Sequence, residues 1–340
     1  MKNIEFPKIS VVVIGLNEEA NLESSLQSVL YSRYPPDKLE LIYVDSGSKD
    51  NSIEIAKKYT DEVFVEAVWP SAARNRNRGL IESRYDIVHF TDGDIVMDPD
   101  YLCFAVEKLS EGGVQCVFGS LEEKNVKGIG KILLHDYSNR RPGYIDAPGA
   151  GGTFLKKVLV EVNGWDERIP RGEESEIGER LRNAGYKIWY LDKKMGIHDS
   201  GIKNISQFLN KQIKEGLSLG AISKIKTSSS FFIATNRFSY NNIIFHLIAL
   251  LLIIIAIIFH FLWFILIAFL MYSFYLLLKY WVFRKIKNPN SLKYFFLMNY
   301  TKSLVLYGFI KFHLKFLFLP ISKKKSIQER ADIIESIRNK

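Results

Sequence analysis

The chain has 340 residues, 47% of them hydrophobic and 24% charged, with a formal net charge of +9 at pH 7. This apolar fraction excludes an intrinsically disordered chain, and the length allows one large domain or two ordinary ones. The charge is unevenly distributed: residues 279–340 contain 14 Lys and Arg against 3 Asp and Glu, a net of +11. The rest of the chain, with 32 basic and 34 acidic residues, is close to neutral.

Short β-branched runs alternate with segments of helical spacing over the first 200 residues. We expect strands over 9–14, 39–44, 63–65 and 86–90, and helices over 19–30, 52–59 and 78–83. Strands that alternate with helices predict an α/β domain with a mostly parallel sheet. Ligands bind at the carboxyl ends of such strands, so the residues that follow each strand are the site candidates.

Two carboxylates, Asp92 and Asp94, flank a glycine directly after the predicted strand 86–90. Oxygen ligands so placed suit Mg²⁺ or Mn²⁺ bound to a diphosphate, whose developing charge the ion would neutralise. The alternative is a plain Asp-Gly hairpin turn. No GxGxxG follows the first strand and no GxxxxGK[ST] occurs, which argues against a dinucleotide-binding fold and a P-loop.

Three arginines, Arg74, Arg76 and Arg78, occupy alternate positions before Gly79. They could bind the phosphates of a nucleotide, or they could form a solvated basic loop.

An acidic run, Gly172–Glu176, precedes a predicted helix over 177–183. Its carboxylates could simply complement the helix dipole, or one of them could act as a general base. His198 follows a predicted strand over 187–191, in a polar loop, and could be a third metal ligand.

Residues 238–278 contain no Asp, Glu, Lys or Arg. One membrane span needs about 20 apolar residues, so this run predicts two transmembrane helices, at about 240–260 and 262–283. Basic residues at both ends of the run predict that both ends lie in the cytoplasm. The alternative is a buried helical pair in a soluble core. We expect residues 291–340 to form an amphipathic interfacial segment and a basic tail that attracts anionic lipid headgroups, so nucleic acid is not an expected partner.

Seven segments follow one another along the chain: VVVIGLNEEANLESSLQSVL, YVDSGSKDNS, ARNRNRGL, FTDGDIVMDPD, GAGGTFLKKVLVEVNGWDERI, GEESEIGERLRNAGYKI and IHDSG. In this order, over roughly residues 8–200, they resemble the family-two inverting glycosyltransferases of the membrane-bound bacterial type. The resemblance implies an A-type glycosyltransferase domain with a Rossmann-like sheet over residues 1–230. It is expected to lie at the cytoplasmic face of the inner (plasma) membrane, anchored through residues 231–290.

The resemblance also implies roles for individual residues. The residues implied to bind the nucleotide sugar are Leu16, Asn17, Glu18, Asp45, Asp92 and either Arg74 or Arg76. Those implied on the acceptor side are Gly151, Gly152, Trp165 and Glu173. The implied ligands of Mg²⁺ or Mn²⁺ are Asp92, Asp94 and His198, of which Asp94 is the better candidate for direct contact. Glu174 is the implied catalytic base.

Three departures from the family pattern refine these expectations. Asp45-Ser46 stands where the family commonly has two acids, and Glu173-Glu174 stands where it usually has Glu-Asp. The segment from Gln207 lacks the Arg-Trp pair of the processive members, which favours the addition of one sugar over the synthesis of a long polymer.

The function implied is transfer of a sugar from a nucleotide-diphosphate donor to an acceptor hydroxyl of a lipid-linked glycan or a cell-envelope polysaccharide precursor. The alternatives are a polyprenyl-phosphate sugar synthase, whose acceptor needs no base, and a catalytically silent nucleotide-binding membrane scaffold.

Overall fold

The computed structural model describes residues 6–67, 71–124, 141–149, 151–169 and 172–202, with short helical stretches further on, the longest at 269–276. The chain divides into two compact units, and the first contains every strand of the described residues. In chain order its elements are β1 (Ile9–Gly15), α1 (Leu22–Leu30), a 3₁₀ turn (Pro36–Lys38), β2 (Leu39–Asp45), α2 (Ser52–Ala56), β3 (Val63–Val65), α3 (Ala72–Glu82), β4 (Ile87–Asp92), β5 (Ile95–Met97), α4 (Tyr101–Ser110), β6 (Cys116–Glu123), β7 (Gly143–Ile145), β8 (Gly152–Leu155), α6 (Lys156–Glu161), α7 (Glu173–Asn183) and β9 (Ile188–His198).

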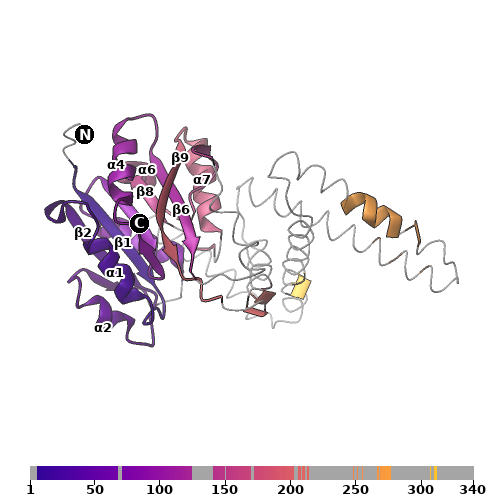
Figure 1. Ribbon diagram of the computed structural model, residues 1–340, viewed down its shortest axis with the longest axis horizontal. Helices are drawn as coiled ribbons and strands as arrows, with labels where there is room; N and C mark the ends of the chain where they lie inside the picture. The colour runs from indigo at the N-terminus through magenta and orange to yellow at the C-terminus, as the bar shows by residue number, and fades with distance from the viewer. Residues whose placement is uncertain are drawn as a thin grey trace. The chain divides into compact units, whose positions relative to one another are not determined.

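The strands form one sheet in the order β3-β2-β1-β4-β8-β6-β9-β5, with β7 beside β9. Figure 1 labels β1, β2, β6, β8 and β9 of this sheet. The pairs among β1, β2, β3 and β4 are parallel, as is β6 with β9, but β8 runs antiparallel to both β4 and β6. Both β5 and β7 are also antiparallel to β9. The prediction of an α/β sheet is therefore confirmed, but the sheet is mixed rather than mostly parallel.

Two hydrophobic cores lie on the two faces of the sheet, because successive side chains of a strand point to opposite faces. In β1, Val11 and Val13 belong to one core, whereas Val12 and Ile14 belong to the other. Helices α1 and α4 contribute to the first core, and α3, α6 and α7 contribute to the second. Every residue of β1 is buried, as expected for a central strand covered on both sides.

The strand register brings several predicted site residues to one edge of the sheet. Gly15 of β1 lies opposite Asp45 of β2, and Ile14 lies opposite Asp92 of β4. At the far side, His198 ends β9 and pairs with Glu123, the last residue of β6. The carboxyl ends of β1, β2, β4, β6 and β9, which are far apart in the sequence, therefore lie at the same edge of the sheet.

Three local predictions differ from the structure. The helix predicted at 78–83 begins at Ala72, because the Ser71 side chain caps it by accepting a hydrogen bond from the backbone N–H of Arg74. His198 was predicted in a loop but ends β9, where pairing with β5 and β6 extends the strand. The Asp-Gly segment is not a hairpin turn, since β4 pairs with β1 and β8 whereas β5 pairs with β9.

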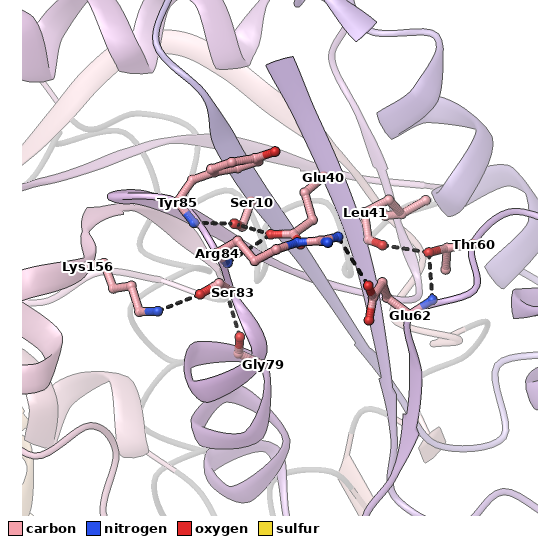
Figure 2. Close-up of polar contacts among 10 residues, drawn as sticks. All are labelled: Ser10, Glu40, Leu41, Thr60, Glu62, Gly79, Ser83, Arg84, Tyr85 and Lys156. Carbon is pink, nitrogen blue, oxygen red and sulfur yellow. Dashed lines mark hydrogen bonds and ion pairs between the residues drawn. The ribbon is translucent and has the colours of Figure 1, made fainter. Parts of the chain in front are cut away.

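A polar network fixes the C-terminal end of α3, around Ser83 and Arg84, to the sheet (Figure 2). The buried carboxylate of Glu40 accepts hydrogen bonds from Ser10 Oγ (2.5 Å) and from the backbone N–H of Arg84 (3.0 Å). The Arg84 guanidinium also pairs with Glu40 and contacts Glu62 at 3.1 Å. Ser83, the C-cap of α3, donates its hydroxyl to the carbonyl of Gly79 (2.6 Å). These contacts hold the helix that carries the arginines in a fixed position on the sheet.

The predicted transmembrane helices at about 240–260 and 262–283, and the interfacial segment and tail at 291–340, fall almost wholly outside the described residues. Within the described part of the chain, no helix is both long enough and apolar enough to cross a membrane. The helical stretch 269–276 carries large exposed apolar side chains, among them Phe269, Leu270 and Phe274.

Candidate active site

Three carboxylates converge where β1 and β4 end. Asp92 is the last residue of β4, and the backbone N–H of Gly93 donates to the carbonyl of Ile14 at 2.8 Å, which fixes the turn before Asp94 against β1. The Glu18 side chain packs directly against Gly93. Burial, followed by the negative charges of Asp94 and Asp92, raises the pKa of Glu18 to about 7. This end of the sheet is therefore a site that favours a cation.

His198 joins this cluster from β9. Its Nε2 lies 3.1 Å from Asp94 Oδ2, and its Nδ1 lies 2.5 Å from Glu123 Oε1. Burial alone would lower the pKa of His198, but the hydrogen bonds to Asp94 and Glu123 outweigh it and raise the pKa to about 10. A carboxylate on Nδ1 fixes the ring so that Nε2 faces the cluster.

Glu123 is a site residue that the sequence reasoning missed. No strand was predicted over Cys116–Glu123, and without it nothing places Glu123 at the same edge as His198. A strand prediction for this run, paired in parallel with the strand ending at His198, would have found it.

The arginines separate into two groups because the segment that carries them is a helix. Arg74 and Arg78 are four residues apart and lie on one face, where they contact the Glu66 carboxylate at 2.6 and 3.3 Å. Arg76 points to a different side of α3 and reaches the carboxylate cluster. Of the two arginines that the resemblance left open, the structure therefore brings only Arg76 together with Asp92.

Arg76 connects the end of β4 with the start of α7. Its side chain is only 2% exposed. Nη2 lies 3.0 Å from Asp92 Oδ1 and 3.7 Å from Glu174 Oε1, and Nη1 donates to Glu173 Oε1 at 2.7 Å. One buried cation thus holds three carboxylates from two motifs that are far apart in the sequence.

The two acids at the start of α7 lie in different surroundings. Gly172 adopts the left-handed region (φ 82°) and turns the chain into the helix, so that Glu173 and Glu174 occupy its first two positions. Glu173 is 7% exposed and is bonded to Arg76, whereas Glu174 is 24% exposed. Burial and the negative charge of Glu173 raise the pKa of Glu174 to about 8, against the opposing effect of Arg76. Glu174 is therefore the better proton acceptor of the two.

Gly151 and Gly152 lie against the end of β4. Gly152 pairs with Phe90, and Gly151 has a φ of +96°. A Cβ on Gly151 would come 2.4 Å from the carbonyl oxygen of Phe90. Only glycine allows the backbone to approach β4 so closely, which is the physical reason for this residue beside Asp92.

The structure places Trp165 in the hydrophobic core, and the acceptor-side role that the resemblance implied for it stays a prediction. The indole is 2% exposed and meets the Phe90 ring edge to face, with a centroid distance of 4.7 Å. The Asn77 side chain bonds both the backbone N–H and the carbonyl of Trp165, each at 2.8 Å. Trp165 therefore packs against Phe90 of β4 and bonds Asn77 of α3, which helps to hold both elements in place.

Because Trp165 fills this core, Trp165→Ala should lower the free energy of unfolding by about 3–5 kcal/mol. Urea unfolding of the purified chain, followed by circular dichroism, measures this loss. The matched control is Ile81→Ala on α3, whose side chain is 73% exposed and whose loss should change stability by less than about 0.5 kcal/mol. Equal effects of the two substitutions would contradict the assignment of Trp165 to the core.

Asp45 shapes the loop that follows β2. Its buried carboxylate accepts hydrogen bonds from the Tyr43 hydroxyl (2.8 Å) and from the backbone N–H and hydroxyl of Ser48 (2.5 and 2.7 Å). The Ser48 hydroxyl in turn accepts from the backbone N–H of Asn17 (2.7 Å), which joins this loop to the one that follows β1. Leu16 precedes Asn17 and is partly exposed. In this structure Asp45 organises the loop, and its implied contact with a base or ribose stays a prediction.

Comparison with known proteins gives this edge of the sheet an identity. Residues 10–153, from β1 to β8, match the model of glycosyl transferase family 2. We call residues 10–153, which match this family, the family 2 domain. It contains Asp45, Arg76, Asp92 and Asp94, whereas Glu174 and His198 follow it in the sequence.

Two curated relatives and one solved structure resemble the chain that carries the family 2 domain. Glycosyltransferase AglE of Haloferax volcanii is 27% identical in an alignment 221 residues long, which covers 62% of this chain and 72% of AglE. Poly-beta-1,6-N-acetyl-D-glucosamine synthase of Staphylococcus aureus is 27% identical over 55% of this chain, and the match spans about half (48%) of the synthase. The mannosyltransferase PcManGT of Pyrobaculum calidifontis, solved with GDP-Man and Mn²⁺, has a TM-score of 0.57 and 17% identity, covers 90% of this chain and 87% of its own, and shares the fold.

The residues at the edge of the family 2 domain fit a divalent ion. Six carboxylates (Glu18, Asp92, Asp94, Glu123, Glu173 and Glu174) face only two cationic side chains, Arg76 and His198, among the described residues. Asp94 Oδ1 is buried and accepts no hydrogen bond from the described residues. No group of three ligands in the described ranges forms a closed metal site, but an ion that also binds phosphates needs only one or two protein carboxylates. Asp94 would hold the ion, with Asp92 and His198 beside it.

Proposed function

We propose that the chain is a membrane-anchored, metal-dependent, inverting glycosyltransferase that moves one sugar from a nucleotide-diphosphate donor to an acceptor hydroxyl. The observation that carries this proposal is the meeting of Asp92 and Asp94 with Glu173 and Glu174 around Arg76, at the carboxyl edge of a family 2 domain. One group of carboxylates serves the donor diphosphate and its ion, and the other serves the acceptor.

The proposed reaction uses Glu174 as the general base. Its carboxylate takes the proton of the acceptor hydroxyl, whose oxygen attacks the anomeric carbon while the bond to the diphosphate breaks on the opposite side, so the configuration inverts. A divalent ion, when bound, neutralises the charge that develops on the diphosphate. Arg76 holds Asp92 and Glu173 in place during transfer.

The acidic character of the α7 side favours an alcohol acceptor over a phosphate. Glu173 and Glu174 lie within 3.7 Å of one Arg76 guanidinium, which Asp92 also contacts, so three acidic groups share one positive charge. A lipid phosphate would add further negative charge and would need no base. We therefore place the polyprenyl-phosphate sugar synthase second; comparing a lipid alcohol with a lipid phosphate as acceptor distinguishes the two.

Anchoring at the inner face of the plasma membrane is supported by the uncharged run 238–278 and the basic excess of +11 that follows it. The exposed apolar side chains of residues 269–276 agree with a lipid environment. A membrane location suits a lipid-linked glycan or an envelope polysaccharide precursor as acceptor. The name of the S. aureus relative, a poly-beta-1,6-N-acetyl-D-glucosamine synthase, also points to a polysaccharide.

The function is tested by screening nucleotide sugars against the purified chain. The preferred donor should raise the thermal midpoint in Mn²⁺ or Mg²⁺, because ligands that bind the folded state stabilise it. Release of the nucleoside diphosphate with an acceptor, and NMR of the product's anomeric centre, then test transfer and inversion. Product mass separates one added sugar from a polymer. Donor binding without any transfer or hydrolysis would favour the silent scaffold.

The rate should depend on pH through Glu174. A general base acts in its ionised form, and the pKa of Glu174 is raised to about 8. We therefore expect kcat/KM to fall about tenfold for each pH unit below that value and to level off above it. The measurement is a kcat/KM profile from about pH 6 to about pH 9 at fixed metal concentration, with donor affinity measured at each pH. A flat profile over this range would contradict the assignment.

A further inference from the structure

Arg76 is the most buried cation of the site, and its contacts have a specific pattern. Its Nη1 donates to Glu173 at 2.7 Å, and its Nη2 pairs with Asp92 at 3.0 Å and lies 3.7 Å from Glu174. The guanidinium therefore binds Glu173 and Asp92 closely and Glu174 only loosely. Of the two acids that begin α7, Glu173 is fixed and Glu174 stays available.

Stability alone does not explain an arginine at this position. Burying an ion pair costs desolvation that its attraction barely repays, and well-packed apolar side chains often serve a core equally well. Direct contact with a nucleotide is not a better explanation, because both terminal nitrogens already face carboxylates and the side chain is 2% exposed. Arg74 and Arg78 are on the same helix but contact Glu66 instead. These contacts fit a role in which Arg76 holds other residues of the site in position.

We propose that Arg76 is a positioning residue for sugar transfer, which sets the distance between the donor carboxylate Asp92 and the base Glu174 by holding Glu173. This inference rests on the proposed function. It also separates the roles of the two neighbouring acids, because Glu173 anchors α7 to Arg76 whereas Glu174 receives the proton.

The first test is Arg76→Lys in the purified chain. Lysine keeps the charge but cannot bind two carboxylates through a planar fork. Misplacement of the base should lower kcat by about 10–100-fold. The Kd of the donor with Mn²⁺ should stay within about threefold of the wild-type value, since no donor contact is lost. Arg78→Lys on the same helix is the matched control and should leave both values unchanged.

The second test asks whether Arg76 acts through Glu174. In a Glu174→Gln background, Arg76→Lys should cause little further loss of rate, because residues that act as a unit are not additive. A full additional loss in that background would overturn the proposal. So would an Arg76→Lys variant whose donor Kd rises about tenfold or more while kcat is unchanged, since that result assigns Arg76 to the donor.

The double variant Arg76→Gln with Glu173→Gln controls for the case in which Arg76→Lys fails to fold. It removes one buried charge of each sign, and it should fold while losing kcat as Arg76→Lys does. Wild-type-like kcat in this folded variant would overturn the positioning role alone. Failure of the wild-type chain to transfer any sugar would instead refute the proposed function, and the positioning role with it.

Discussion

Glu174→Gln should lower the kcat for sugar transfer by about 10²–10⁴-fold, which is the usual contribution of a general base. Glutamine keeps the shape of the side chain and can remain near Arg76 Nη2, which lies 3.7 Å from Glu174 in the native site. It cannot take a proton from the acceptor. Steady-state kinetics measure the loss, and a thermal shift with the donor should show nearly unchanged binding, because the substitution leaves Asp92 and Asp94 intact.

Glu176→Gln is the matched control for Glu174→Gln. Glu176 lies on the same helix and is more buried, but its carboxylate pairs with Arg180 one turn further on (2.5 Å). Its loss should reduce stability without lowering kcat. Wild-type-like turnover by Glu174→Gln would remove Glu174 from the base role. If Glu173→Gln were inactive at the same time, the base would be Glu173, and the raised pKa of Glu174 would only reflect its burial beside Glu173.

Asp94→Asn should weaken metal-dependent donor binding by about a hundredfold or more, because even residues that only support a metal ligand contribute about 10–100-fold. Asn has the same shape but removes the negative charge beside His198, whose Nε2 lies 3.1 Å from Asp94 Oδ2. It also changes the carboxylate whose Oδ1 atom is buried and accepts no hydrogen bond from the described residues. Donor affinity should become independent of Mn²⁺, which calorimetric titration with and without the metal measures.

Asp100→Asn is the control for Asp94→Asn. Asp100 pairs with Arg33 on the surface at 2.7 Å, so its loss changes the overall charge equally but leaves the site untouched. Donor binding by this variant should depend on Mn²⁺ as in the wild type. If Asp94→Asn kept that dependence as well, Asp94 would not hold the ion, and Asp92 would be the next carboxylate to test.

The sequence determined those parts of the fold that depend on local pattern. The β-branched runs at Ile9–Gly15 and Leu39–Asp45 were predicted almost to the residue, since a buried central strand needs apolar side chains on both faces. Helix α3 was predicted to start at Arg78 rather than Ala72, because the cap that starts it, Ser71, lies before an arginine-rich run that resembled a loop. The strands β5, β7 and β8 were not predicted, since strands of three or four residues have little pattern of their own and depend on their partners. The eight-residue strand β6 was also missed, although it begins with the apolar residues Cys116, Val117 and Phe118.

The candidate site divides in the same way. Motif order along the chain was enough to select Asp92, Asp94, Glu173, Glu174 and His198. It could not choose between Arg74 and Arg76, because that choice depends on which way each side chain leaves a helix whose start was misplaced. Nor could it show that Trp165 is buried, since an aromatic residue beside a motif suits a core and a binding surface equally well.

Sequence alone therefore determined the type of fold, the resemblance to family 2 and the candidate groups for the chemistry, because these depend on residue types and their spacing. Only the tertiary structure decided how those groups are paired. The contacts of Arg76 with Glu173 and of His198 with Glu123 join residues 97 and 75 positions apart. Distances and pKa values arise from such contacts, because charge and burial act through space and not along the chain.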